Sequence, residues 1–157
     1  MDVRQATIAD AEILSALNAD VQKLHADAHP QLFKQPSDQT FPPSAALDVL
    51  NDPNAYIYIG KVKGEAVGYI YAEIRTSPEN DFRYEMRRVS IHDISIKPDH
   101  QKKGYGERLI QSVKMLAQKH DITMVILDVW SFNTNARSFF AEQGFTAFNE
   151  RMWLHIS

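Results

Sequence analysis

A basic, glycine-bearing turn between an apolar stretch and an amphipathic pattern constrains the fold of this 157-residue chain more than any other feature. The turn spans residues 101–106, follows an apolar stretch at 89–96 and leads into a helical pattern. The first N–H groups of a helix lack internal partners, and the helix dipole is positive at that end. Glycine also lets a ligand approach the main chain closely. The turn therefore predicts an anion site, and a pyrophosphate is the ligand that suits it best.

Two common phosphate motifs do not fit the turn. The sequence contains no G-x-x-x-x-G-K-[ST], and Leu109 stands where a dinucleotide fingerprint needs its third glycine. The pattern Gln-x-x-Gly-x-Gly instead resembles the acyl-CoA pyrophosphate loop of the GNAT N-acetyltransferase superfamily. Taken alone, the turn is also compatible with an ordinary strand–helix connection that carries two solvated lysines.

A second pattern lies further along the chain, at residues 133–145. It reads Asn-x-x-Ala and then aromatic-x-x-x-Gly-Phe, and it resembles the second signature of the same superfamily. Ile-Ser-Ile at 94–96 precedes the loop as the superfamily's fourth strand does. On these two signatures, in this order, the chain is identified as a member of the GNAT superfamily. The resemblance assigns the binding of acetyl-CoA, as co-substrate, to the strand end, the loop and the second signature: Ile94, Ser95, Ile96, Gln101, Lys102, Lys103, Gly104, Tyr105, Gly106, Asn133 and Phe140.

The hydrophobic pattern predicts a mixed α/β sheet. Strand patterns occur at 3–6, 56–62, 65–74, 83–96, 122–130, 145–148 and 152–156, and helical patterns at 7–29, 44–50, 105–119 and 133–143. Strands 83–96 and 122–130 are expected to lie parallel, with the 105–119 helix as the crossover. The resemblance implies a single N-acetyltransferase domain over 1–157 with the GNAT fold. That fold has a mixed central sheet of about six or seven strands, flanked by about four helices, with the parallel pair splayed at its centre.

Composition narrows the classes of function. A net charge of −3 with only local basic residues argues against a general nucleic-acid binder. The absence of cysteine excludes disulfides, thiolate metal sites and a cysteine nucleophile, and it fits a reducing cytoplasm. The longest apolar run, around 124–127, is too short to span a membrane, and no signal peptide is visible. We therefore expect a cytoplasmic protein without membrane contact; a homodimer is expected only at the level of the family.

Direct acyl transfer to an amine needs a base, and His92 is the first candidate. Strand side chains alternate, so His92 is predicted to share a face with Ser90, Ile94 and Ile96 and to point away from Asp93. Its imidazole titrates near neutral pH, and its position resembles that of a histidine base in arylalkylamine acetyltransferases. The alternative is a histidine that is simply packed or hydrogen-bonded on the sheet.

Asp128 is the second candidate for the base. A carboxylate that interrupts an apolar strand is costly to bury, so a functional role would explain its presence. Its position resembles that of the glutamate base in ribosomal-protein alanine acetyltransferases, although aspartate is one methylene shorter. The alternative is a partly exposed carboxylate at the strand end that pairs with a nearby cation.

Phe140 stands where many superfamily members carry a tyrosine that serves the departing thiolate. Phenylalanine cannot donate a proton. Water or another hydroxyl, such as Ser138 or Tyr105, could replace the tyrosine, or the thiolate could leave without an acid. The domain could also be a catalytically weak or silent acyl-CoA-binding module.

The resemblance gives Asn133 a hydrogen bond to the pantetheine arm, while its place before a helix predicts an N-cap; the two roles are compatible. His25 and His29, four residues apart, could share a metal, but the glutamate of H-E-x-x-H and a third ligand are missing, so no metal is predicted. Because the first helix and the loop after it wall the acceptor site in this fold, both histidines, Phe33 and Phe41 are expected to line the acceptor pocket. The alternative is that the histidines are exposed at the end of the helix. The chain is thus predicted to transfer an acetyl group from acetyl-CoA to a primary amine of a small molecule or peptide.

Overall fold

The computed structural model describes residues 1–157. Five strands form one sheet in the order β1-β2-β3-β4-β5. The strands are β1 (Asp2–Gln5), β2 (Ala55–Val62), β3 (Glu65–Ser77), β4 (Met86–Ile96) and β5 (Val125–Leu127). Four α-helices accompany them: α1 (Ala11–Ala28), α2 (Pro43–Asn51), α3 (Tyr105–Lys119) and α4 (Thr134–Glu142). Short 3-10 turns, η1 (Ile8–Asp10) and η2 (Pro98–His100), precede α1 and the 101–106 turn.

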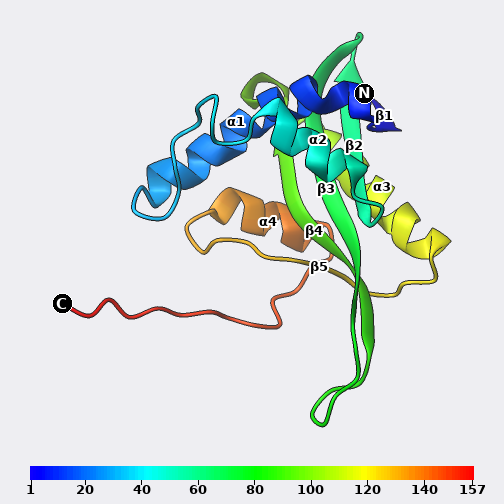
Figure 1. The fold of residues 1–157 in the computed structure, drawn as a ribbon, viewed down its shortest axis with the longest axis vertical. Coiled ribbons are helices and arrows are strands. Elements are labelled where there is room, and N and C mark those ends of the chain that lie inside the picture. The colour runs from blue at the N-terminus through cyan, green and yellow to red at the C-terminus, as the bar shows by residue number, and fades with distance from the viewer.

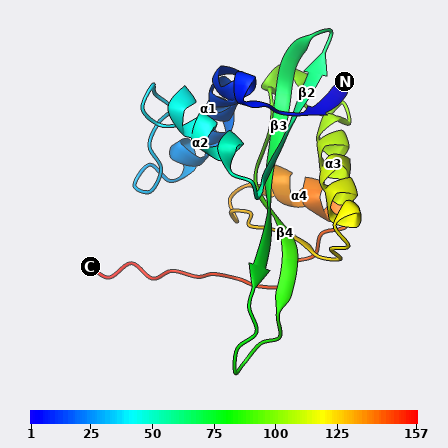
Figure 2. The same cartoon turned by 45° about the vertical axis from the view of Figure 1, so that its right-hand side comes forward.

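The helices cover both faces of the sheet. Helices α1 and α2 lie on one face, and α3 and α4 lie on the other (Figures 1 and 2). Each layer has its own apolar core. The first joins the α1 and α2 stripes to β2 and to Tyr69 of β3, and the second joins α3 and Phe140 of α4 to β3 and β4. No helix of the chain combines the length and the apolar character that a bilayer crossing demands.

The expected parallel pair is present, with α3 as its crossover. Strand β5 pairs in parallel with β4, whereas every other neighbouring pair is antiparallel. The parallel ladder runs from Val89 with Val125 to Ile91 with Leu127 and stops there, although β4 continues to Ile96. The two strands are therefore free to separate beyond Ile91 and Leu127.

Two features of the predicted sheet are wrong. The sheet has five strands and not six or seven, because residues 145–148 and 152–156 form no strand. The parallel pair consequently lies at the edge of the sheet and not at its centre. Strand β5 is also shorter than the apolar run at 122–130 that predicted it. A suitable side-chain pattern makes a strand only where a neighbouring strand forms hydrogen bonds with its backbone N–H and C=O groups. The C-terminal segment has no such neighbour in its own chain.

A half-buried ion pair joins β1 to the start of α1. The Asp10 carboxylate, 4% exposed, accepts hydrogen bonds from the Arg4 guanidinium at 2.7 and 2.8 Å and from the Thr7 backbone N–H at 2.8 Å. The bonds from Arg4, and then those from Thr7, hold the pKa of Asp10 at about 2, against an ordinary value of 3.8 and despite its burial. The ionised carboxylate therefore stabilises the fold above its unfolded pKa.

We expect Asp10→Asn to lower the free energy of unfolding by about 1–2 kcal/mol at pH 7. This figure is smaller than the pKa shift of Asp10 alone would give, because the Arg4 side chain is 43% exposed and water weakens the ion pair. A depressed pKa gives stability that is lost as the pH falls, so the difference between wild type and variant should shrink between about pH 4 and pH 2. Urea unfolding across that range measures it. Asp27→Asn, in the exposed Lys23–Asp27 pair, is the control and should leave the stability almost unchanged at every pH.

Candidate active site

The turn at 101–106 closes over the end of β4. The Gln101 side chain donates to the backbone carbonyl of Ile96 at 3.0 Å, and the Lys103 ammonium donates to the Asp99 carbonyl at 3.0 Å. Lys102 and Gly104 both adopt left-handed backbone conformations, with φ of 58° and 76°. These conformations fold the chain sharply between the strand and α3 and leave residues 101–104 exposed.

The backbone N–H groups of this turn are unusually free. From Lys102 through Glu107, no backbone N–H donates to a protein acceptor, and the first helical bond runs from the Arg108 N–H to the Gly104 carbonyl at 3.4 Å. Successive free N–H groups at the positive end of a 15-residue helix are an arrangement that favours the binding of an anion. The predicted anion site is therefore supported by the backbone itself, and Lys102 and Lys103 add positive charge at its rim.

The two glycines of the turn have different roles. A Cβ on Gly104 would meet no atom within 4 Å, so only its left-handed backbone favours glycine. A Cβ on Gly106 would lie 2.9 Å from Cζ of Phe139. A side chain at position 106 would therefore have to displace the Phe139 ring, so Gly106 also serves the packing of α3 against α4, whereas the sequence alone suggested that both glycines serve the ligand.

A β-bulge reshapes β4 at the candidate base. Ala72 pairs with Ile91 and Tyr71 pairs with Asp93, which leaves His92 as the extra residue. Ile94 and Ile96 pack against the core beneath α3, while His92 and Asp93 both line a hollow on the opposite face, beneath α1 and α2. The predicted alternation is thus wrong on two points: His92 does not share a face with Ile94 and Ile96, and Asp93 does not point away from it.

The hollow that His92 lines has a volume of about 240 Å³. Apolar and polar side chains from α1, the segment before α2, α2 itself and strands β3 and β4 surround it: Leu14, Asn18, Phe41, Val49, Tyr69, Tyr71, His92 and Asp93. The His92 ring lies 4.8 Å from the Tyr71 ring, and its Nε2 lies 2.7 Å from Oε2 of Glu73. Asp93 Oδ2 accepts from the Tyr69 hydroxyl and, at 3.0 Å, from the Asn18 amide.

The two carboxylates beside His92 differ in their electrostatics. Burial raises the pKa of Asp93 above its ordinary value, and the hydrogen bonds from Tyr69 and Asn18 only partly oppose this. Burial also disfavours ionised Glu73, but hydrogen bonds from Arg75 and His92 outweigh it and lower the pKa of Glu73. Glu73 therefore stays anionic through neutral pH and can hold the His92 imidazole in one orientation.

Asp128 directly follows β5, and it is exposed. His92 and Asp128 come immediately after the last paired residues, Ile91 and Leu127, so both candidate bases lie where the parallel strands part. The exposed position at the strand end agrees with the alternative suggested for Asp128, but none of the ion pairs involves it.

Asn133 caps α4, because its Oδ1 accepts from the Ala136 N–H at 3.1 Å; the predicted N-cap is confirmed. Phe140 is 7% exposed and packs in the α3 core, with ring centroids 5.3 Å from Phe139 and 5.7 Å from Phe145. Ser95, 8% exposed, lies near the end of β4.

Of the four residues predicted for the acceptor pocket, Phe41 lines the hollow beside His92, whereas His25, His29 and Phe33 gather in a separate aromatic cluster. His25 lies 5.2 Å from Phe33 and 5.8 Å from Phe132, and its Nδ1 lies 2.7 Å from the Val21 carbonyl. His29 lies 5.2 Å from Trp130 and 5.3 Å from both Phe132 and Trp153. No group of three or more His, Cys, Asp or Glu side chains is arranged so that it could hold a metal ion.

Sequence reasoning missed Asn18, Tyr69, Glu73 and the place of Asp93. The period-2 pattern of β3, which puts Tyr69, Tyr71 and Glu73 on one face, was a usable signal for Tyr69 and Glu73. The bulge that turns Asp93 towards them leaves no comparable sequence signal. Asn18 comes from a helix, and only the packing of α1 on the sheet brings it to Asp93.

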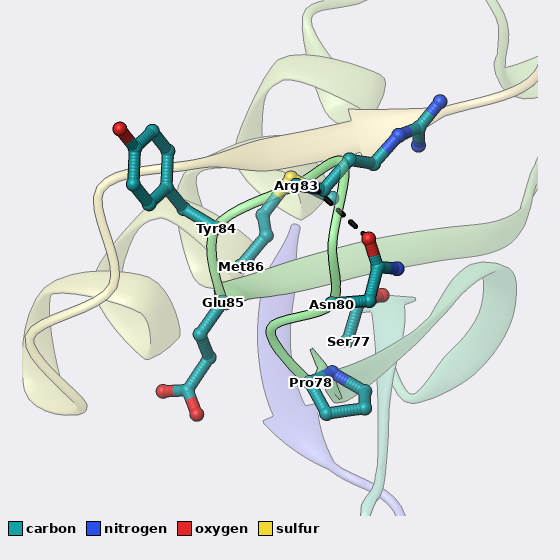
Figure 3. Close-up of a pocket in the computed structure, with 7 residues that line it drawn as sticks. All are labelled: Ser77, Pro78, Asn80, Arg83, Tyr84, Glu85 and Met86. Atoms are coloured by element: carbon teal, nitrogen blue, oxygen red, sulfur yellow. Dashed lines mark hydrogen bonds between the residues drawn. The ribbon is translucent and has the colours of Figure 1, made fainter.

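A larger hollow, about 570 Å³, lies within the β3–β4 hairpin loop (Figure 3). It is lined by residues of that loop and by the strand ends Ser77 and Met86. Within the loop, Oδ1 of Asn80 accepts from the Phe82 and Arg83 N–H groups at 2.9 and 3.0 Å. The hairpin projects away from the body of the protein (Figure 1), and none of the predicted site residues lines this hollow. We therefore place the candidate active site at the parting of β4 and β5, with the smaller hollow beside it.

The packing of Phe139 of α4 against Gly106 of α3 can be tested by substitution. We expect Gly106→Ala to lower the free energy of unfolding by about 1–3 kcal/mol, the usual cost of overpacking, although alanine improves helix propensity. The same change in a Phe139→Leu background should cost clearly less. Chemical denaturation of the four proteins measures the coupling; stabilisation by alanine in the wild-type background would contradict the proposed contact.

Comparisons with known proteins agree with this geometry. The profile of the Acetyltransferase (GNAT) family matches residues 18–145. An uncharacterized N-acetyltransferase encoded in the pepI 3' region of Lactobacillus delbrueckii subsp. lactis is 26% identical over 102 residues. That alignment covers 65% of this chain and 58% of the relative, so the chain spans less than two thirds of the relative's length.

Solved structures share the fold. A tetramutant of the BH1408 protein from Bacillus halodurans matches with a TM-score of 0.94 and 19% identity, over 99% of this chain and 100% of that one. A second variant of the same protein matches with a TM-score of 0.94 and 20% identity over 100% of both chains, the C-terminal segment included. The aminoglycoside N-acetyltransferase AAC(6')-Iy in complex with CoA matches with a TM-score of 0.74 and 19% identity, over 99% of this chain and 93% of that one. With its free-amide turn, its parting parallel strands and a family match over most of its length, the chain belongs to the GNAT acetyltransferase family.

Proposed function

We propose that this protein transfers an acetyl group from acetyl-CoA directly to a primary amine of a small molecule or peptide. The observation that carries the proposal is the run of free N–H groups from Lys102 to Glu107, which suits the pyrophosphate of CoA. The relative crystallised with CoA, AAC(6')-Iy, supports the same ligand class. The pantetheine arm would then run from this turn into the gap between β4 and β5, towards Asn133.

His92 is the base in this proposal. A primary amine attacks the thioester carbon only after it has lost its proton, and His92 lies at the parting of the strands with its side chain 32% exposed. Glu73, ionised and 2.7 Å from Nε2, keeps the proton of the neutral imidazole on that nitrogen. Nδ1 is therefore the atom left to accept the proton of the amine, directly or through water. Asp128 is the alternative base on the neighbouring strand.

We propose that the amine acceptor binds in the hollow beneath α1 and α2. Tyr69, Tyr71 and Phe41 give it aromatic walls, and Asp93 and Glu73 supply negative charge close to the base. Such a site favours a cationic amine. His25, His29 and Phe33 line a separate aromatic cluster, and we propose that they contact the more distant part of the acceptor.

The buried Phe140 supports a second candidate, a weak or silent acyl-CoA-binding module, because no hydroxyl stands at that position to protonate the thiolate. The two candidates differ in one measurement. Release of free CoA thiol, followed across a library of primary amines with product identification by mass spectrometry, should show amine-dependent turnover. CoA binding without any amine-dependent release would favour the silent module.

Two substitutions of the same glycine test the phosphate site. Asparagine and aspartate have nearly equal shapes, and both tolerate the left-handed backbone of Gly104. Gly104→Asp places a negative charge beside the proposed pyrophosphate and should abolish the rise in melting temperature that CoA causes, whereas Gly104→Asn should retain most of it. Differential scanning fluorimetry with and without CoA measures both. Equal shifts in the two variants would contradict the assignment.

Substitution of the proposed base should slow turnover. We expect His92→Ala to reduce kcat by roughly two to four orders of magnitude at neutral pH, the usual contribution of a general base, with partial recovery at high pH, where the ammonium loses its proton without a base from the protein. Glu73→Gln should cost less and should shift the pH–rate profile, because it removes the charge beside the imidazole. Asp128→Asn is the matched control. If Asp128→Asn were inactive while His92→Ala kept its activity, Asp128 and not His92 would be the base.

A further inference from the structure

Asp93 is a carboxylate without a cation of its own. It lines the hollow beneath α1 and α2, where its Oδ2 accepts from the Tyr69 hydroxyl and, at 3.0 Å, from the Asn18 amide. Both donors are neutral, and Oδ1 has no side-chain partner. None of the ion pairs of the chain involves Asp93, and no lysine or arginine lines the hollow. His25 acts on Asp93 electrostatically, but it lies beyond ion-pair distance.

A carboxylate in this position is costly to the chain. Tyr69, its hydrogen-bond donor, is 2% exposed and belongs to the core of this face, and burial raises the pKa of Asp93 above its ordinary value. An asparagine would accept the same hydrogen bonds without a charge. Carboxylates removed from water are usually paired with a cation. Because the chain provides none, we expect the cation to come from a ligand that enters the hollow.

This cation is not the amine that reacts. A carboxylate beside an ammonium stabilises the charged form and opposes the loss of its proton. Acetylation requires that loss, and His92 is the proposed base. His92 and Asp93 are neighbours in the chain, with Cα atoms about 3.8 Å apart, and both side chains line the same hollow. A base and a carboxylate so close together therefore suit two different nitrogen atoms of one acceptor.

We propose that the acceptor contains two amines joined by a short alkyl chain, and that Asp93 binds one of them as an ammonium while the other is acetylated beside His92. The acetylation rests on the proposed function, whereas the binding of the diamine does not. The remaining walls suit such a molecule: Leu14 and Val49 contact an alkyl chain, and the rings of Phe41 and Tyr71 attract an ammonium.

The size and charge of the hollow narrow the acceptor class further. Its volume of about 240 Å³ is below the range of about 300–1,000 Å³ for sites of drug-sized ligands, so it holds a short diamine unit. The separate aromatic cluster would then contact the rest of a longer polyamine. An acceptor with a carboxylate in place of the second amine would be repelled by Asp93, because no cation lines the hollow.

The acetylation of the second nitrogen balances as follows in the proposed site. The reacting ammonium gives one proton to His92, and its nitrogen forms a bond to the acetyl carbon. The C–S bond breaks, and CoA leaves as the thiolate with the electron pair of that bond. The second proton, which the nitrogen loses as the amide forms, passes through water to the thiolate. The ammonium on Asp93 takes no part in these steps and holds the acceptor in place.

Three acceptors of nearly equal length test the proposal in the wild-type protein: butane-1,4-diamine, n-pentylamine and 5-aminopentanoate. They present an ammonium, a methyl and a carboxylate group to Asp93. Release of CoA thiol at one pH gives kcat/KM for each. We expect kcat/KM to be about 10- to 100-fold higher for the diamine than for pentylamine, the usual effect of a hydrogen bond between charged groups, and lowest for 5-aminopentanoate. The two equivalent ends of the diamine account for only about twofold of this preference.

Asp93→Asn should remove the preference. Asparagine has nearly the same shape and still accepts from Tyr69 and Asn18, so the ratio of kcat/KM for diamine over pentylamine should fall to about twofold. Because the ratio compares two acceptors on the same variant, a general loss of activity cancels. Asp20→Asn removes the same charge from the exposed side of α1 and should keep the wild-type ratio. The wild-type comparison needs no variant, so the test does not depend on the folding of Asp93→Asn.

Binding without acetylation is measured by isothermal titration calorimetry of the same amines, with and without CoA. In wild type the Kd of the diamine should be about 10- to 100-fold below that of pentylamine, and in Asp93→Asn the two should be nearly equal. Binding of the diamine that depends on Asp93, without thiol release from any amine, would retain the diamine site and overturn acetyl transfer. Equal values for the two amines in wild type, or a preference that persists in Asp93→Asn, would overturn the diamine site, and thiol release would show that acetyl transfer still holds.

Discussion

The candidate site depends on the short parallel ladder between β4 and β5. The ladder begins at Val89 with Val125 and stops at Ile91 with Leu127. Helix α3 makes the crossover that a parallel pair requires, and it packs its apolar stripe on the same strands. Because the ladder stops before β4 ends, the two strands separate beyond Ile91 and Leu127. The two candidate bases, Asn133 and the turn that starts α3 all come after these last paired residues. A longer ladder would close the gap between them.

The bulge at His92 decides the chemistry of the neighbouring hollow. One extra residue in β4 puts His92 and Asp93 on the same side as Tyr69, Tyr71 and Glu73. Without it, strict alternation would turn one of the two towards the α3 core, where a buried charge would be costly. The bulge thus concentrates the ionisable groups on the face that α1 and α2 cover, and it leaves the α3 face apolar.

Glycine illustrates how a motif can combine two physical requirements. Gly104 adopts a left-handed backbone in open space, beside N–H groups that have no protein acceptor. Gly106 removes a side chain that would meet Phe139. The Gln-x-x-Gly-x-Gly pattern therefore combines the proposed anion site with the packing of α4 on α3, and a substitution at each glycine should disturb a different one of the two.

The sequence by itself determined the family, the order of the elements, the parallel pair with its crossover and the turn before α3. These follow from local patterns: hydrophobic periodicity, a glycine-bearing turn and the N-cap at Asn133. The tertiary structure alone decided the number of strands, the side on which Asp93 lies, and the gathering of Asn18, Tyr69 and Glu73 around it. A bulge changes the facing of every later residue without a sequence signal, and a strand pattern such as 152–156 forms a strand only where another backbone is free to pair with it.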